Sequence, residues 1–373
     1  MSTFDVPDLI NRSPGDIGCH TVRDVIDYAA SKRSQEPFLI SPHTGQTVTF
    51  GGLRDQARKI TFELQQLGLV PGDKVAFLMD NGLFTAQVFL GTMYGGFVAV
   101  PLNVGAGESQ LCYTLDHSEA KAIYVSPEYG ALLKSLTPKV SPKMHVIAAD
   151  VDGVSETGGE HADSLELGAL DPEDPSLLMY TSGSTGQPKA AVHSHRTILA
   201  HGRNSIESHQ LTASDRSLLV LPLYHINAEC VTLVPTLMSG GAVIIPHRFK
   251  VSQFWDWLDE HRCTWSAIVP TIVSQLLDWR DPRAGSREAV FKRIRFLRSS
   301  SAPLAPSLHR EFLDKFNLLL IQAMGCSEGG NVFSNPQPPR ANKIGSPGLP
   351  WGFETKIIDR QGNEVPAGEP GAV

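Results

Sequence analysis

The sequence predicts an α/β protein built from two mostly parallel sheets that are flanked by helices. The first observation is an alternation of short apolar runs with amphipathic helical stretches, which is typical of parallel sheets covered by helices. The second is a single interruption over residues 151–174, where Gly, Glu and Asp are frequent and no apolar periodicity is sustained. We therefore expect two α/β blocks joined by a surface connection.

The elements of the first block follow from the spacing of its apolar residues. Leu53, Ala57, Ile60 and Leu64 are three or four positions apart, which gives a helix one apolar face. Two apolar runs around a Ser-Pro-His-Thr-Gly turn predict a β-hairpin over residues 38–50. The same criteria predict helices over residues 21–30, 53–64, 84–94 and 108–117, and strands over residues 38–40, 48–50, 74–79, 98–102, 122–125 and 145–148.

The alternation resumes after residue 174 and predicts a second block of similar size. Its helices are expected over residues 195–207, 228–238, 254–261, 271–279 and 308–316, and its strands over residues 218–221, 242–245, 266–269, 296–298 and 318–322. From Gly345 onward the chain is rich in Gly and Pro, and short β pieces such as 353–358 are expected. The sequence thus suggests an N-terminal α/β subdomain (1–170), a second α/β subdomain (171–345) and the start of a β subdomain (346–373).

Composition and charge argue against several classes of protein. A net charge of −7 and a pI near 6.0 argue against a nucleic-acid-binding chain, which would carry a basic surplus. No apolar run approaches the roughly 18 residues that a membrane helix needs, and the polar residues 1–18 do not resemble a signal peptide. The cysteines are far apart and never paired as CxxC, so neither a disulfide framework nor a zinc site is expected. We expect a cytoplasmic protein with reduced thiols.

The stretch L-M-Y-T-S-G-S-T-G-Q-P-K, residues 178–189, has the composition of a polyphosphate-binding loop. Glycines let backbone N–H groups approach an anion, hydroxyls add donors, and a lysine adds a positive charge. Pro188 separates the second glycine from the lysine, so this is not a Walker-type loop. A flexible linker is the alternative, but the flanking apolar run and Pro-Lys pair favour anion binding. The candidate residues are Thr181, Ser182, Gly183, Ser184, Thr185, Gly186 and Lys189.

Three further strand ends carry polar side chains, and ligands of open α/β sheets bind outside the carboxyl ends of the strands. His225 follows a strand and a proline, with Asn227 and Ala228 next to it. For this histidine alone, a helix cap or a buried structural role is the favoured alternative. The second strand end carries small residues that allow a flat ring to lie against the backbone, although a Ser-rich turn before a helix is the alternative. Its candidate residues are Ser300, Ser301, Ala302 and Pro303.

The last strand end places a carboxylate and a hydroxyl next to each other. Mg²⁺ in proteins takes one or two carboxylates together with phosphate oxygens and water, which suits Glu328 beside Ser327. A glutamate that faces solvent is the commoner arrangement and is the alternative. The candidate residues are Gln322, Met324, Gly325, Cys326, Ser327 and Glu328.

Six other side chains receive structural interpretations. The histidines after the loop are interpreted as helix-face residues and not as metal ligands, because no Cys or carboxylate pattern accompanies them. The tryptophans of the second block are interpreted as packing residues. These residues are His193, His195, His201, Trp255, Trp257 and Trp265.

The four candidate segments resemble, in the same order, motifs of the adenylate-forming superfamily. This superfamily contains acyl-CoA synthetases, adenylation domains of nonribosomal peptide synthetases and beetle luciferases. The loop resembles the superfamily's phosphate-binding motif, P-L-Y-H resembles its P-L-[FY]-H segment, S-S-S-A-P-L its S-G-G-A-P-L turn, and M-G-C-S-E its Y-G-x-T-E motif. The resemblance extends from about Thr21 onward and is strongest to AMP-dependent acyl-CoA ligases. Ser300 and Ser301 replace two glycines and Met324 replaces an aromatic residue, so the adenine contacts stay open.

The resemblance implies a role for each matched segment. Residues 181–189 would hold the ATP triphosphate, His225 would orient the carboxylate of the acid, and Asn227 and Ala228 would begin the acyl pocket. The adenine and AMP contacts would come from residues 300–303 and 322–327, and Glu328 would bind Mg²⁺.

The resemblance also implies an activity, that of an AMP-forming ligase that joins a small-molecule carboxylic acid to CoA with ATP and Mg²⁺. Two alternatives stay open: an adenylation domain that loads a carrier protein, and a catalytically inactive nucleotide- or acyl-binding chain. Superfamily members continue into a T-G-D-type segment and a C-terminal lid domain with a catalytic lysine. This sequence contains neither, so we expect impaired thioester formation. The acid is not readable from the sequence, with Arg298 and Arg248 as candidates for pairing a second carboxylate.

Overall fold

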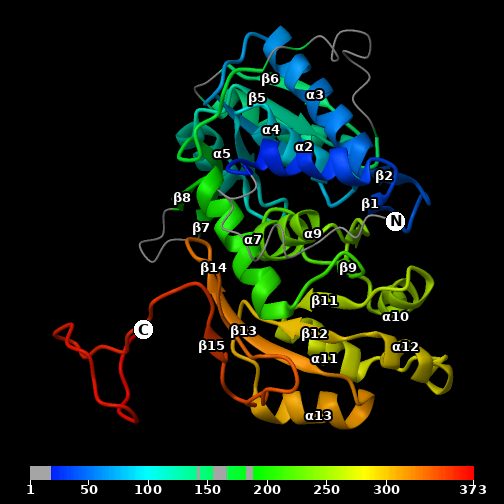
Figure 1. The fold of residues 1–373 in the computed structure, drawn as a ribbon. Coiled ribbons are helices and arrows are strands. Elements are labelled where there is room, and N and C mark those ends of the chain that lie inside the picture. The colour runs from blue at the N-terminus through cyan, green and yellow to red at the C-terminus, as the bar shows by residue number, and fades with distance from the viewer. Residues whose placement is uncertain (1–17, 141–142, 154–164, 166, 182–187) are drawn as a thin grey trace.

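The computed structural model describes residues 18–140, 143–153, 165, 167–181 and 188–373. Figure 1 shows two α/β bodies, each built on its own twisted sheet. The first body contains β3 to β8, and the second contains β9 to β15 together with the hairpin β1–β2. The predicted fold class, two mostly parallel sheets flanked by helices, is confirmed.

The first sheet has six strands in the order β6-β5-β3-β4-β7-β8. All neighbours pair in parallel except β7 and β8, which form an antiparallel hairpin at one edge. Every residue of β4 and β5 is buried, as expected for strands covered by helices on both faces. The strands are β3 (Lys74–Leu78), β4 (Val98–Pro101), β5 (Ala122–Val125), β6 (His145–Ala148), β7 (Pro175–Thr181) and β8 (Lys189–Ser194).

The second sheet has nine strands in the order β15-β14-β13-β12-β11-β9-β10-β1-β2. Its central pairs are parallel, and antiparallel hairpins close both edges. The strands are β1 (Pro37–Ile40), β2 (Thr47–Thr49), β9 (Arg216–Leu219), β10 (Ala242–Ile244), β11 (Trp265–Ile268), β12 (Phe296–Ser299), β13 (Leu320–Cys326), β14 (Gly330–Ser334) and β15 (Leu349–Pro350).

The two sheets exchange strands along the chain. Hairpin β1–β2 comes early in the sequence but joins the second sheet, whereas hairpin β7–β8 follows residue 170 and joins the first. Helix α7 packs against β8 of the first sheet and against β14 of the second, so it spans both bodies (Figure 1). The division of the chain at residues 170 and 171 therefore stays a proposal. A hairpin from each side of this division belongs to the sheet of the other side.

The helices cover the faces of both sheets and bury apolar stripes. Helix α2 begins with a capping box, in which Thr21 accepts from the Asp24 backbone and Asp24 accepts in return. Every residue of α4 is buried, because this helix packs against α2, α3 and β4 at once. The helices are α2 (Val22–Arg33), α3 (Phe50–Gln66), α4 (Leu83–Tyr94), α5 (Glu108–Ser118), α6 (Gly130–Leu136), α7 (His195–His209), α8 (Ile226–Ala228), α9 (Val234–Ser239), α10 (Val251–Glu260), α11 (Pro270–Asp278), α12 (Glu288–Arg293) and α13 (Pro306–Phe316).

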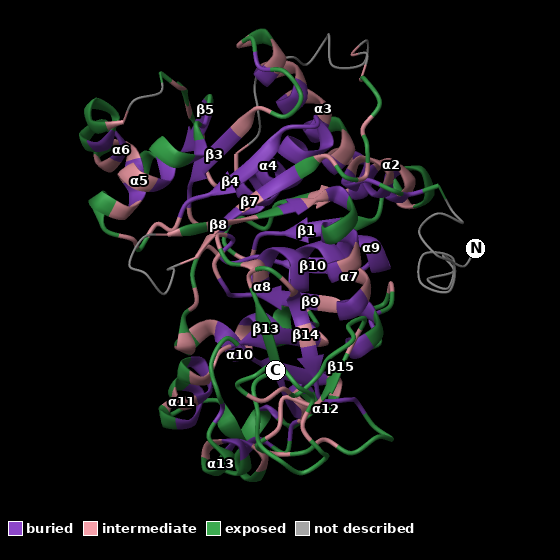
Figure 2. Cartoon of the chain, turned by 90° about the vertical axis from the view of Figure 1, so that its left-hand side faces the viewer, coloured by how far each residue is buried: buried purple, intermediate pink, exposed green. Residues whose placement is uncertain are grey.

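Burial follows the sheets closely. Figure 2 shows the strands of both sheets as mostly buried, with exposed residues on the outer helices such as α13 and along the C-terminal segment. The predicted packing role of Trp255, Trp257 and Trp265 is confirmed, since all three are at most 3% exposed.

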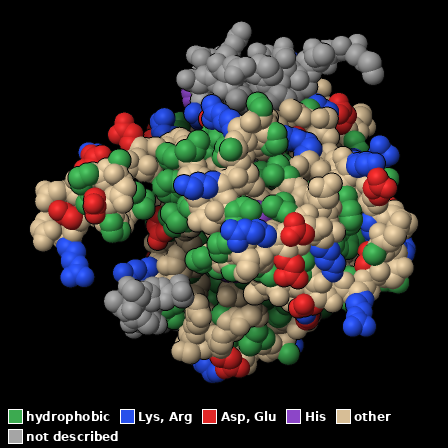
Figure 3. All heavy atoms as spheres, turned by 90° about the horizontal axis from the view of Figure 1, so that it is seen from below, with side chains coloured by type: hydrophobic (Ala, Val, Ile, Leu, Met, Phe, Trp, Pro, Cys, Tyr) green, Lys and Arg blue, Asp and Glu red, His purple; other side chains and the backbone are tan. Residues whose placement is uncertain are grey.

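None of the helices in the described part of the chain is both long and apolar enough to cross a membrane. On the face drawn in Figure 3, basic and acidic side chains are interspersed.

Several predicted elements need correction. The predicted helix over residues 228–238 is three segments, α8, a π-helical turn (Glu229–Leu233) and α9. The predicted strand 318–322 extends to Cys326, because β14 pairs with its second half. The predicted β piece at 353–358 contributes only isolated bridges at Ile358. His193 lies on strand β8 and not on a helix.

One residue of the expected surface connection is an anchor. Asp152 is 6% exposed and accepts from the Ser41 hydroxyl at 2.6 Å and from the Leu83 backbone N–H at 2.9 Å. Its Oδ2 also lies 2.9 Å from Nε2 of His247, and these hydrogen bonds hold the pKa of Asp152 below its ordinary value against the opposing effect of burial. Asp152 thus ties α4 to the second sheet, and the surface prediction is wrong at this residue.

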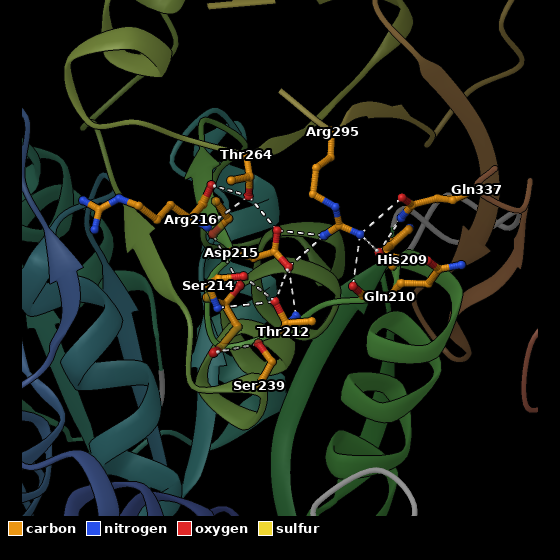
Figure 4. A network of polar contacts seen from close by, with 12 residues as sticks. His209, Gln210, Thr212, Ser214, Asp215, Arg216, Ser239, Thr264, Arg295 and Gln337 are labelled. Carbon is orange, nitrogen blue, oxygen red and sulfur yellow. Dashed lines mark hydrogen bonds and ion pairs between the residues drawn. The ribbon is translucent and has the colours of Figure 1, made fainter. Parts of the chain in front are cut away.

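A polar network joins the amino ends of the second sheet's strands (Figure 4). Arg295, just before β12, donates to both carboxylate oxygens of Asp215, each at 2.7 Å. Asp215 stands just before β9 and also accepts from Thr264, which precedes β11, at 2.7 Å. Arg295 further donates to the carbonyl oxygen of His209 at the end of α7. The network thus fixes the ends of the strands opposite to those where ligands are expected.

Candidate active site

A cavity of about 630 Å³ lies at the carboxyl ends of β7, β9 and β12 and beside the β13–β14 hairpin. This is the edge where ligands of open α/β sheets bind. The cavity brings together residues from all four candidate segments of the sequence. The candidate residues that line it are Thr181, His225, Asn227, Ser300, Ser301, Gly325, Cys326 and Ser327.

Other candidate residues lie outside this lining. Glu328 and Lys189 are exposed, Ala228 and Gln322 are buried, and Met324 is 42% exposed. Neither Ala302 nor Pro303 lines the cavity, although both continue the turn that contributes Ser300 and Ser301. The predicted loop residues Ser182, Gly183, Ser184, Thr185 and Gly186 lie outside the described residues.

Thr181 and Lys189, which flank the candidate phosphate loop in the sequence, face each other across the β7–β8 pair. Thr181 is the last residue of β7 and pairs with Lys189, the first residue of β8. The Thr181 hydroxyl lies 3.5 Å from the Lys189 carbonyl oxygen. The strand at Lys189–Ser194 gave no clear apolar signal in the sequence, yet it places Lys189 beside the cavity-lining Thr181. A lysine and a threonine hydroxyl at one loop base are suited to an anion.

The segment that carries His225 is fixed from the first body. Asn81, which follows β3, donates to the carbonyl oxygen of Leu221 at 2.9 Å and accepts from the N–H of Leu223 at 2.8 Å. Because Asn81 is only 4% exposed, these bonds form in a buried environment and restrain the chain two residues before His225. The sequence gave no signal for Asn81.

The His225 ring is open to the cavity and stacks at a tilt against Tyr224, with 4.7 Å between ring centroids. The surrounding protein nonetheless lowers the pKa of His225 below the ordinary 6.5 by desolvation. The imidazole is therefore neutral near pH 7 and offers one N–H donor and one acceptor nitrogen.

Asn227 links the start of α8 to the turn after β12. Its amide nitrogen donates to the Ser300 hydroxyl at 2.9 Å and lies 3.4 Å from that of Ser301. Its carbonyl oxygen accepts from Arg298 at 2.9 Å. Ser301 has a φ of +71°, a left-handed conformation that costs a non-glycine residue roughly 1 kcal/mol. Strained residues of this kind gather at functional sites, where the surrounding structure holds them in place.

The β13–β14 hairpin presents Ser327 and Glu328 in its turn. The strands approach so closely that a Cβ on Gly325 would lie 1.9 Å from the carbonyl oxygen of Gly330, so only glycine fits there. Nε2 of His193 lies 2.8 Å from the carbonyl oxygen of Ser327 and holds the turn against β8. Glu328 makes no ion pair with any residue that the structure describes, which leaves its carboxylate available for a cation.

The cavity also has a wall that the sequence did not predict. Helix α5 and the segment before it contribute Asn103, Gln110 and Thr114, and β7 contributes Tyr180. The Tyr180 hydroxyl lies 2.8 Å from Nδ1 of His117 on α5, which connects this wall to β7. These residues come from the first body, so the cavity lies between the two sheets.

The architecture of this chain is shared with proteins of known structure. The fold is that of the N-terminal domains of adenylate-forming enzymes. Structures of apo MatB from Rhodopseudomonas palustris and of the anthranilate CoA ligase AuaEII with anthranoyl-AMP match with TM-scores of 0.82 and 0.83. They are 23% and 22% identical and cover 94% of this chain, and the chain covers 68% and 67% of theirs. The N-terminal domain of FACL13 from Mycobacterium tuberculosis matches with a TM-score of 0.80 at 22% identity, over 92% of this chain and 86% of that one.

The chain belongs to the AMP-binding enzyme family. The sequence model of this family matches residues 26–373. A sulfoacetate–CoA ligase of Cupriavidus necator is 36% identical over 356 residues, which is 95% of this chain and 69% of the relative. An oxalate–CoA ligase of Arabidopsis thaliana is 31% identical over 306 residues, or 79% of this chain and 59% of the relative. The chain thus spans about three fifths to two thirds of the length of these relatives.

Proposed function

We propose that this chain carries the adenylation site of an AMP-forming carboxylic acid–CoA ligase. The observation that supports this most is the convergence of Thr181, His225, Ser300 and Ser327 on one cavity at the carboxyl ends of the strands. These residues come from four separate segments, each of which resembles a nucleotide- or acid-binding motif. The relatives described above, named CoA ligases, support CoA as the acceptor.

The proposed reaction has two steps. A carboxylate oxygen of the acid attacks the α-phosphorus of ATP, the P–O bond to the β-phosphate breaks, and pyrophosphate leaves. The CoA thiolate then attacks the acyl carbon, the bond from that carbon to the phosphate oxygen breaks, and AMP leaves. Catalysis of the first step consists mainly of positioning the reactants and stabilising charge on the phosphates.

His225 and Lys189 would act on opposite ends of the reacting groups. The neutral His225 ring can donate one hydrogen bond to the carboxylate without forming an ion pair, which orients the carboxylate and keeps it nucleophilic. Lys189 and loop residues 182–186 would balance the charge of the β- and γ-phosphates. The turns at 300–303 and 322–327 would hold the adenine and ribose. Asn227, Ala228 and the 300–302 part of the first turn would also border the acyl group.

Glu328 would hold Mg²⁺ together with phosphate oxygens. No group of three potential metal ligands occurs among the described residues. A single exposed carboxylate nonetheless fits Mg²⁺, which keeps several waters and takes phosphate oxygens as ligands. The ion would supply charge neutralisation at the phosphates.

All five cysteines are free, which supports a reducing, cytoplasmic location. A carrier-protein thiol is the alternative acceptor. Mass spectrometry of the acyl product with free CoA and with a phosphopantetheinyl protein would distinguish the two.

The proposal is tested by acid-dependent exchange of labelled pyrophosphate into ATP over a panel of carboxylic acids. We expect exchange with at least one acid, and loss of exchange in Lys189→Ala and Glu328→Ala. Matched controls are Lys292→Ala and Glu288→Ala, which remove an exposed pair on α12. Wild-type exchange in Lys189→Ala and Glu328→Ala would remove the roles given to these residues.

A further inference from the structure

A buried positive charge lies in the wall of the cavity. Arg298, in the middle of β12, is 1% exposed and lines the cavity. Burying a charge in a protein is unfavourable unless an opposite charge compensates it. No described carboxylate forms an ion pair with Arg298, and its Nε is buried without a hydrogen-bond partner.

The contacts of Arg298 are all to neutral acceptors. Nη1 donates to Asn227 Oδ1 at 2.9 Å and to Ser300 Oγ at 2.7 Å, and Nη2 donates to Asn331 Oδ1 at 2.9 Å. Burial lowers the pKa of Arg298 to about 9, so the guanidinium is still protonated at neutral pH. These amides and the hydroxyl satisfy part of its hydrogen bonding but leave its charge in place.

Burial also acts on two other titratable groups of the second body. Glu229, next to α8, is fully buried, neither of its carboxylate oxygens has a partner, and burial raises its pKa well above the ordinary value. Burial therefore disfavours the ionised form of Glu229. His209 is also fully buried, and burial together with the charges of Arg298 and Arg295 lowers its pKa. The positive charge of Arg298 thus has no ion-pair partner among the carboxylates that the structure describes.

The hydrogen bonds determine where the Ser300 hydroxyl points. A serine hydroxyl accepts two hydrogen bonds and donates one. Ser300 Oγ already accepts from Arg298 at 2.7 Å and from Asn227 Nδ2 at 2.9 Å. Its own proton has no acceptor among the described residues, and Ser300 lines the cavity. Ser300 can therefore donate a hydrogen bond to a ligand in the cavity. The guanidinium of Arg298 is bonded to the same hydroxyl oxygen.

His225 and Arg298 line the same cavity but differ in burial. His225 is exposed to the cavity at the start of α8, whereas Arg298, Asn227 and Ser300 are buried in its wall. In the proposed function the reacting carboxylate lies at His225. The Ser300 hydroxyl, which is hydrogen-bonded to Arg298, is then available to another part of the same acid.

We propose that the acid bound here carries a second anionic group, a carboxylate or a sulfonate, that accepts from the Ser300 hydroxyl and is balanced by the charge of Arg298. This assignment rests on the proposed adenylation site and specifies the class of its substrate. Ser301, which also lines the cavity, is the neighbouring hydroxyl residue. A purely structural Arg298, which ties α8 and β14 to β12 through Asn227 and Asn331, is the alternative.

Binding of acids to the intact chain, measured by calorimetry with a non-hydrolysable ATP analogue present, distinguishes the two. Malonate and sulfoacetate serve as dianionic acids, and propionate and hexanoate as monoanionic ones. We expect at least one dianion to bind about tenfold more tightly than both monoanions, as one charge-assisted hydrogen bond allows. Comparing malonate with sulfoacetate shows whether the second group is a carboxylate or a sulfonate.

Ser300→Ala should weaken the favoured dianion about tenfold and change the monoanions less than about twofold. The matched control is Ser299→Ala, which removes the neighbouring hydroxyl in β12, itself buried and without a partner. Arg298→Gln, checked for folding by circular dichroism, should abolish the preference for dianions. Equal affinity for both classes of acid, or an equal loss for all acids in Ser300→Ala, would overturn the assignment.

Pyrophosphate exchange with the same acids separates this assignment from the proposed function. Exchange with monoanions alone would contradict the second anion site but would support the proposed adenylation. Tight binding of a dianion without exchange for any acid would contradict adenylation and leave the anion site standing. Absence of binding for all four acids would contradict the anion site.

Discussion

His193 on β8 and Ser327 in the β13–β14 turn are joined by a hydrogen bond of 2.8 Å from Nε2 to the carbonyl oxygen. Because a carbonyl oxygen only accepts, His193 carries its proton on Nε2, and its Nδ1 accepts from His201 Nε2 at 3.3 Å. His201 Nδ1 is then unprotonated and buried without a partner. Both imidazoles are neutral in this chain of bonds, which connects the strand after the candidate phosphate loop to the turn that carries Glu328.

This arrangement makes stability dependent on pH. Burial lowers the pKa of His201 to about 4 and also lowers that of His193. Between pH 6.5 and 4 the unfolded chain binds protons that the folded chain does not, so stability is full above pH 6.5 and falls toward pH 4. For His201 the loss amounts to about 3 kcal/mol. Urea unfolding across this range measures it.

The variant His201→Phe should reduce the slope of that part of the pH profile, because one titrating group is gone, while His195, whose pKa burial also lowers to about 4, remains. The control is His145→Asn, which changes an exposed histidine on β6 and should keep the wild-type slope. An unchanged slope in His201→Phe would show that other groups are responsible for the acid sensitivity.

Asn81 should matter for catalysis without touching the substrate. Asn81→Ala leaves the Leu221 carbonyl and the Leu223 N–H unpaired, which should lower the free energy of unfolding by about 2 kcal/mol. The segment before His225 is then less restrained, so pyrophosphate exchange should fall about tenfold at saturating acid. Asn363→Ala, at an exposed position, is the control. Wild-type exchange in a destabilised Asn81→Ala variant would limit Asn81 to a structural role.

The network in Figure 4 should affect stability alone. Arg295→Met removes the two bonds to Asp215 at the amino ends of the strands and should destabilise the fold by about 2 kcal/mol. Acid affinity, measured by calorimetry, should stay within about twofold, because the cavity lies at the opposite strand ends. Lys292→Met on the exposed face of α12 should change neither quantity. A large loss of acid affinity in a folded Arg295→Met variant would contradict this separation.

Ser301 should be a site where glycine stabilises the protein. Its φ of +71° suits glycine, so Ser301→Gly should raise the free energy of unfolding by about 0.5–1 kcal/mol. Ser135→Gly in helix α6 should instead lower it by about 0.5 kcal/mol, since the serine conformation there is helical. Thermal unfolding of both variants checks the signs. Destabilisation by Ser301→Gly would mean that contacts of the hydroxyl outweigh the backbone strain.

The sequence predicted the fold class and most elements because apolar periodicity is a local property. Strand β13 was predicted in part. Strands β8 and β14, which pair with β7 and β13, contain too few apolar residues to show a strand pattern. The π-helical turn at Glu229–Leu233 could not be predicted, because its backbone follows from packing against α7, β9 and β14.

The candidate site was predicted where it consists of contiguous motifs and missed where it depends on tertiary contacts. His225, Ser300 and Ser327 lie in short segments that can be recognised along the chain. Asn81 and Asn331 act through residues more than 30 positions away, so nothing local distinguishes them. Arg298 was named as a candidate for pairing a second carboxylate, but its burial and its lack of a described carboxylate partner are visible only in the structure.

The central claim, attack of a carboxylate on the α-phosphorus of ATP, is tested by isotope transfer. The acid labelled with ¹⁸O in its carboxyl group is incubated with ATP, Mg²⁺ and CoA, and the AMP formed is analysed by mass spectrometry. One ¹⁸O atom is expected in the phosphate of AMP, since the bridging oxygen stays with phosphorus when the acyl carbon is attacked by sulfur. Unlabelled AMP, or label found in inorganic phosphate with ADP as the product, would contradict it.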